Sequence, residues 1–79
     1  MITAPQLIAA RGLLGWSQSD LARASGVGLS TIKRMEQSDG PLRGIAANVW
    51  KVQAAVGRAG ILFIDEDERA GPGVRLGKR

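Results

Sequence analysis

Hydrophobic residues in the first part of the chain recur with the period of an α-helix. Leu7, Ala10 and Leu14 are separated by three and four positions, which places them on one face of a helix. Thr3 precedes this stretch and Gly15 follows it, and both residue types are typical of helix ends. The pattern therefore predicts a first amphipathic helix between these two residues.

Two shorter helices are predicted next. Ser17 is suited to cap a helix, and Asp20 stands three positions later, where a capping box places its acidic partner. Gly26 is typical of the position just past a helix end, so the second helix is expected to stop there. A third helix is expected to open around Gly28 and to run to Gln37, after which turn-forming residues follow. Two short helices joined by a glycine turn form a helix-turn-helix.

The rest of the chain predicts a fourth helix and two short strands. The apolar stripe of that helix consists of Ile45, Val49, Val52 and Val56. Residues 61–64 and 73–76 are short apolar runs separated by turn formers, and they predict a hairpin, which must lie on the helices or pair with another chain. The expected fold is mainly α: a helix-turn-helix domain of four to five helices over residues 1–60, followed by a C-terminal β-hairpin extension over residues 61–79.

Composition removes several classes of function. The 79 residues include no Cys and no His, which excludes disulfides, thiolate and imidazole metal sites, a Cys nucleophile and the usual general base. The acidic run at residues 65–68 lacks the alternating spacing of a calcium loop, so a solvated loop is the better interpretation. No catalytic residue, metal or cofactor is expected, and an enzyme is disfavoured. Without a membrane-length apolar run or a signal pattern, a cytoplasmic protein is expected.

The two tryptophans carry a separate expectation. Trp16 and Trp50 are not interleaved with basic residues, so packing is favoured over stacking on single-stranded bases.

The net charge of +4 is unevenly distributed. Residues 1–60 hold seven basic side chains and three acidic ones, whereas residues 61–79 hold four of each. A positive field on a small helical unit suits a polyanionic partner such as nucleic acid.

One face of the third predicted helix is polar and cationic. That face carries Leu29, Ser30, Lys33, Arg34 and Gln37. Ile32 and Met35 point the other way, toward the expected core. A helix with these two faces suits insertion into the major groove of DNA, whereas an isolated pair of cationic residues would indicate only a solvated surface.

Each exposed residue of this helix has an expected role. Arg34 is suited to a bidentate contact with guanine, and Ser30 is suited to a hydrogen bond with a base edge or a phosphate. Leu29 is suited to an apolar contact with a thymine methyl group. Thr31 and Lys33 are expected to contact phosphate and to fix the register of the protein on the duplex.

Residues 17–36 resemble the phage-repressor and Cro type of helix-turn-helix, known as the XRE family. The matching positions are Ser17, Gln18, Leu21, Ala22, Gly26, Val27, Ser30, Thr31, Ile32, Met35 and Glu36. The resemblance covers about residues 5–60 and implies a lambda-repressor-like fold that binds double-stranded DNA and regulates transcription. Gly28 stands where many members have Ser or Thr, so a weaker cap is expected on the third helix. Leu29 replaces a more usual polar base-reading side chain, so modest sequence specificity is expected.

The resemblance also implies roles outside the third helix. Ser17, Gln18 and Arg43 match positions that contact the DNA backbone, and the glutamine of the family also braces the recognition helix. Arg11 and Glu36 match a partly buried ion pair with a structural role.

The expected mechanism is that of a repressor that acts as a homodimer on an inverted repeat, because one helix-turn-helix reads only a few base pairs. The apolar strand suggests a dimer interface at Ile61, Phe63 and Val74, since an unpaired apolar edge invites association. The alternative is a protein-interaction adapter, such as an antitoxin or anti-activator, that binds a partner through the C-terminal strand.

Overall fold

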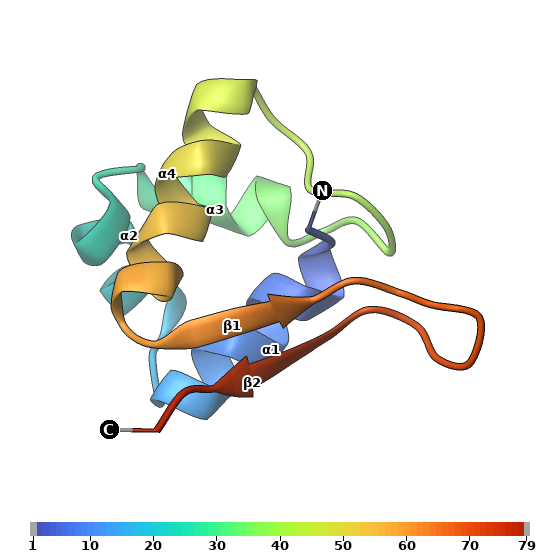
Figure 1. Cartoon of the computed structure of the whole chain (residues 1–79). Helices are drawn as coiled ribbons and strands as arrows, with labels where there is room; N and C mark the ends of the chain where they lie inside the picture. Colours follow the sequence, from blue (N-terminus) through green and yellow to red (C-terminus); the bar gives the residue numbers. More distant parts are fainter. Residues whose placement is uncertain (1, 79) are drawn as a thin grey trace.

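The computed structural model describes residues 2–78, within which four helices are followed by a two-stranded antiparallel sheet (Figure 1). The elements are α1 (Ala4–Leu14), α2 (Gln18–Ser25), α3 (Leu29–Met35), α4 (Ala46–Arg58), β1 (Ile61–Ile64) and β2 (Gly73–Leu76). The predicted fold, mainly helical with a C-terminal hairpin, is confirmed.

Reciprocal side-chain caps explain where α1 and α2 begin. The Thr3 hydroxyl accepts a hydrogen bond from the backbone N–H of Gln6, and the Gln6 side chain accepts one from the Thr3 N–H. Ser17 and Asp20 make the same exchange at the start of α2, as predicted. Gly26 ends α2 with a φ of 75°, a left-handed conformation that favours glycine.

The third helix is short and lacks a side-chain cap. Gly28 precedes it without a side chain to accept the first N–H groups, and the helix ends at Met35, two residues before the expected Gln37. Seven residues are too few for a stable isolated helix, so α3 depends on its buried side chains, Ile32 and Met35.

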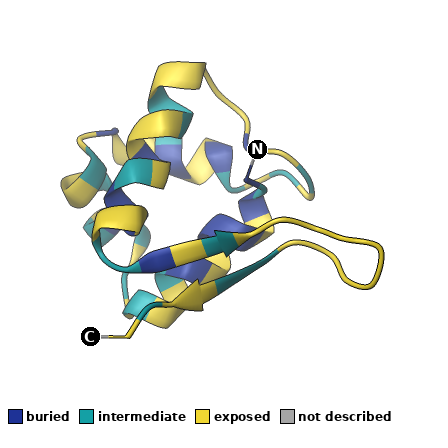
Figure 2. Cartoon of the chain, viewed as in Figure 1, coloured by how far each residue is buried: buried dark blue, intermediate teal, exposed yellow. Residues whose placement is uncertain are grey.

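One hydrophobic core lies between the helices and the hairpin, and buried residues line the inner sides of these elements (Figure 2). Its fully buried large side chains are Leu7, Leu21, Ile32, Met35, Val52 and Val56. The stripe predicted on α4 is correct at Val52 and Val56 but wrong at Ile45, which is 67% exposed because it caps the helix rather than lying within it. Leu42, from the loop before α4, is buried instead.

The tryptophans differ in their environment. Trp16 is half-buried and packs against the core, as expected. Trp50 is 69% exposed, so the packing expected for it is wrong. The cause is its position, since two residues along a helix rotate a side chain by about 200° and Trp50 therefore lies opposite the buried Val52.

The hairpin packs its inner face on the helices, with β2 beside α1 (Figure 1). In the antiparallel register Phe63 lies opposite Val74, and Ile61 lies opposite Leu76. Ile61 is buried, and Phe63 and Val74 pack against the core of their own chain. Of the three residues expected at a dimer interface, Ile61 is therefore enclosed within its own chain, whereas Phe63 and Val74 are only partly covered.

A buried glutamine attaches the hairpin to α1. Gln6 is 5% exposed, and its side-chain amide donates to the carbonyl oxygens of Ile64, at 3.3 Å, and Gly73, at 2.9 Å. Its oxygen accepts the Thr3 N–H at 2.8 Å, so the side chain joins a helix cap to the last residue pair of the hairpin. The two strands are therefore packed as part of the same unit as the helices.

Among residues 2–78, no helix combines the length and the apolar character that a membrane span requires. The same residues contain no group of three or more Asp and Glu side chains arranged to hold a metal ion.

Candidate nucleic-acid interface

The structure places the expected base-contacting residues together on the solvent side of α3. Leu29, Ser30 and Arg34 are exposed, as is Lys33, while Thr31 is half-buried. The opposite side of the helix is fixed in the core. The exposed face therefore presents aliphatic, hydroxyl and cationic groups from one short, supported helix.

The other expected phosphate contacts come from the segments on either side of α3. Ser17 is exposed at the N-terminus of α2, and its hydroxyl oxygen accepts the capping bond from the backbone N–H of Asp20. Arg43 is exposed in the loop that follows α3. Gln18 is half-buried, and one of its two amide hydrogens is already used within the chain.

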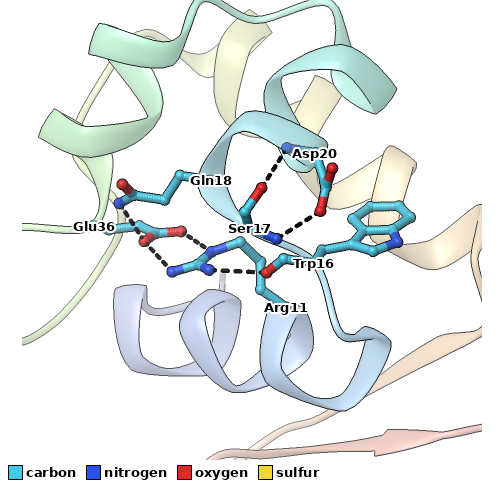
Figure 3. Close-up of polar contacts among 6 residues, drawn as sticks. All are labelled: Arg11, Trp16, Ser17, Gln18, Asp20 and Glu36. Atoms are coloured by element: carbon cyan, nitrogen blue, oxygen red, sulfur yellow. Dashed lines mark hydrogen bonds and ion pairs between the residues drawn. The ribbon is translucent and has the colours of Figure 1, made fainter.

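That hydrogen belongs to a network that joins α1, the start of α2 and the end of α3 (Figure 3). Arg11 Nε and Nη2 donate to the two carboxylate oxygens of Glu36 at 2.8 and 2.7 Å, in the bidentate geometry that strengthens such pairs. Arg11 Nη1 donates to the carbonyl of Trp16 at 3.1 Å. The expected ion pair is present, with side chains 16% exposed for Arg11 and 4% for Glu36.

Gln18 completes the network and connects it to the interface. Its Nε2 donates to Glu36 Oε1 at 2.9 Å, so the residue that follows the α2 cap is bonded to the residue that follows α3. Its second amide hydrogen and its oxygen are not used in this bond. Gln18 therefore fixes the position of α2 relative to the end of α3, which is the bracing role that the resemblance implies.

Charge on this side of the molecule is dominated by cations. Glu36 is neutralised by Arg11 and nearly enclosed, so it subtracts little from the potential around Lys33 and Arg34. At the start of α2, the backbone N–H of Ser17, then its hydroxyl, and the nearby Arg23 charge lower the pKa of Asp20. This carboxylate remains ionised at neutral pH and keeps the cap intact.

Sequence reasoning missed two residues that shape the molecule. Gln6 was not singled out, because its partners lie 58 and 67 positions away in the chain. The exposure of Trp50 was missed although the helical spacing from Val52 carried the signal.

Comparison with known families gives an independent result. A family model described as helix-turn-helix, of the XRE type, matches residues 7–43. The match includes the Arg11–Glu36 pair and every residue expected to contact DNA. No curated protein matches the chain. Residues 7–43 therefore belong to the XRE-type helix-turn-helix family of DNA-binding transcription regulators.

Proposed function

We propose that the protein is a repressor that binds a specific inverted repeat in double-stranded DNA as a dimer. The observation that carries this proposal is the pairing of an exposed reading face on α3 with a buried network that fixes α3 to α1 and α2. A rigid support reduces the ordering cost of binding and holds base-reading groups in register.

Direct base reading rests on three side chains. Arg34 carries the planar fork of donors that matches the two acceptors of guanine in the major groove. Ser30 offers one hydroxyl to a base edge, and Leu29 offers apolar contact to a thymine methyl group. One strong hydrogen-bonding reader predicts a short, modestly specific half-site.

Phosphate contacts set the orientation. Thr31 and Lys33 lie between Ser30 and Arg34 on α3. Ser17 and Gln18 lie at the N-terminus of α2, and Arg43 follows α3. Contacts from these separate segments hold the protein on the backbone without reading sequence. The salt dependence of binding will report how many of them form.

The small number of base-reading residues in one chain favours a dimer. One helix-turn-helix contacts only a few base pairs, and two copies about one helical turn apart double the recognised sequence. A dimer that covers a promoter blocks access of polymerase, which makes repression the proposed outcome.

Selection from a randomised duplex pool at near-physiological salt tests the proposal. We expect the retained sequences to contain an inverted repeat with half-sites near one helical turn apart. Arg34→Ala is the matched control, and it should lose preference at one position of each half-site. General, salt-sensitive binding without enrichment of any sequence would refute specific regulation by this protein.

A second candidate function is supported by the outer face of the hairpin. Leu62 is 57% exposed, and Ile64 lies exposed beside it on the same strand. The sheet has only two strands within residues 2–78, so each strand has an edge that pairs with no other strand there. An adapter would use this surface to bind a protein partner. Leu62→Lys would then abolish regulation in cells and leave DNA binding unchanged, whereas unchanged regulation would exclude this function.

A further inference from the structure

A second surface of the molecule is unusually apolar and lies on the N-terminal half of α4. Trp50 and Ile45 are 69% and 67% exposed, the two highest values among the exposed large hydrophobic residues described. Beside them is a shallow hollow of about 260 Å³. The hollow is lined by Leu42, Gly44, Ala46, Val49, Trp50 and Gln53. We call these six residues, together with Ile45, the α4 patch.

Helical geometry shows that the outer side of α4 is not an ordinary solvated face. The residues within about 60° of Trp50 around the helix axis are Ala46, Ala47, Gln53, Ala54 and Gly57, none of which is charged. An exposed helix face is normally polar or charged, and a cluster of exposed apolar groups indicates a surface that another molecule covers. Lys51 and Arg58 flank this face rather than interrupt it.

The α4 patch is continuous with the candidate DNA interface. Leu42 and Gly44 line the hollow and are the chain neighbours of Arg43, the expected phosphate contact after α3. Gly44 has a φ of 128°, which favours glycine, and a Cβ there would lie 3.6 Å from the side chain of Met35 at the end of α3. A molecule seated on the patch would therefore lie next to the end of the recognition helix.

We propose that the occupant is a second copy of this chain, related by a two-fold axis that places each Trp50 against the hollow of the other copy. A two-fold interface uses the same surface on both partners, so a projecting side chain needs a recess on the same patch to receive it, and the α4 patch has both. Each chain carries a net charge of +4, and an uncharged contact surface lets two such chains meet with little repulsion. This inference rests on the proposed function, because it assigns the dimer surface of the same regulator.

The size of the patch predicts a weak dimer. One large side chain per copy dominates it, and a tryptophan buries about 150–250 Å². The total buried area is then at the low end for specific interfaces, below about 1,200 Å². We expect the chains to be mainly monomeric in dilute solution and to pair when DNA holds two copies at a high effective concentration.

Binding to matched DNA probes tests the dimer surface. The measurement compares affinity for the selected inverted repeat with affinity for a duplex that carries one half-site. We expect the wild-type protein to favour the repeat by at least about tenfold, and Trp50→Glu to lose that advantage while it keeps its half-site affinity. Leu62→Glu is the control, because it places the same charge on an exposed apolar residue of the hairpin, and it should retain the advantage. Retention by Trp50→Glu, or loss only in Leu62→Glu, would overturn the inference.

A second measurement separates this inference from the proposed function. Trp16→Phe leaves Trp50 as the only tryptophan, so its fluorescence reports directly on the patch. With rising protein concentration, or on a bound repeat, we expect the emission to shift to shorter wavelength as the indole leaves water. If no DNA sequence is selected, the proposed function fails. A concentration-dependent shift together with dimers in sedimentation would then still support the surface, whereas a constant spectrum with monomers up to millimolar concentration would overturn it.

Discussion

Replacing Arg11 by Met should destabilise the fold more than replacing Glu36 by Gln, although the two residues share one ion pair. Arg11→Met keeps much of the aliphatic stem but leaves a carboxylate that is 4% exposed with Gln18 as its remaining hydrogen-bond donor. Removing one partner of a buried pair costs about 3–5 kcal/mol. A domain of 79 residues has a stability of about 4–12 kcal/mol, so this loss is a large fraction of the total.

Glu36→Gln should cost less, because the charged group that remains is the more exposed Arg11 guanidinium. The Arg11 guanidinium is 16% exposed, retains the Trp16 carbonyl as an acceptor, and can still donate to the amide oxygen of the new side chain. The cost is then that of weakened charge-assisted hydrogen bonds, about 1.5–3 kcal/mol. The double variant removes both charges and should cost less than Arg11→Met alone.

Urea denaturation of the wild type, both single variants and the double variant measures these differences, with the slope m checked for constancy. The loss in Arg11→Met should also lower Tm by about 12 °C or more. Equal effects of the two single variants, or a double variant that equals their sum, would show that the burial of the Glu36 carboxylate does not govern the energetics of this network.

Three further predictions concern other parts of the chain. Arg34→Ala should weaken binding to the selected site by about 1–3 kcal/mol and relax the base preference at one position. Lys33→Ala should weaken binding uniformly across sequences and reduce the salt slope by about one. Salt-dependent DNA titrations measure both effects. Gln6→Leu should cost about 1–3 kcal/mol by leaving the carbonyl groups of the hairpin unpaired, and hydrogen exchange should show faster opening of residues 61–76. The pKa of Asp20 is lower in the folded chain than in the unfolded chain. The stability that this carboxylate adds to the fold is therefore complete above about pH 4 and is lost as pH falls through the folded pKa. Asp20→Asn should flatten that part of the profile of urea midpoint against pH.

Each of these expectations has a clear contrary result. A change of preferred base in Lys33→Ala would mean that this residue reads sequence. Unchanged exchange of the hairpin amides in Gln6→Leu would mean that apolar packing alone holds the hairpin. An acid profile of Asp20→Asn that coincides with the wild-type profile would show that the α2 cap adds no pH-dependent stability.

Features encoded by neighbouring residues were predictable from the sequence. The start of α2 depends on Ser17 and Asp20, three positions apart, and its end depends on the conformational freedom of Gly26. The candidate interface was equally predictable from the sequence, because the buried Ile32 and Met35 leave only one side of α3 for solvent. Local spacing is sufficient in these cases, since partners within one helical turn determine the outcome.

The orientation of the hairpin was not predictable in the same way. Residues 61–64 are all apolar, so the alternation that normally separates a core face from a solvent face is absent. Only the docking of the sheet beside α1 decides that Ile61 and Phe63 face inward and Leu62 faces outward. The role of Gln6 was hidden for a related reason, because nothing near it in sequence identifies acceptors that lie in the hairpin.

The absence of a side-chain cap on α3 has a consequence for how this regulator can change its target. The helix is stabilised from its inner side, by Ile32 and Met35, so the outward residues add little to folding. Substitutions at Leu29, Ser30 and Arg34 are therefore expected to be nearly neutral for stability, within about 0.5 kcal/mol. Under the proposed function, new operator preferences are therefore open to this scaffold by exchange of these three residues, without compensating changes elsewhere in the chain.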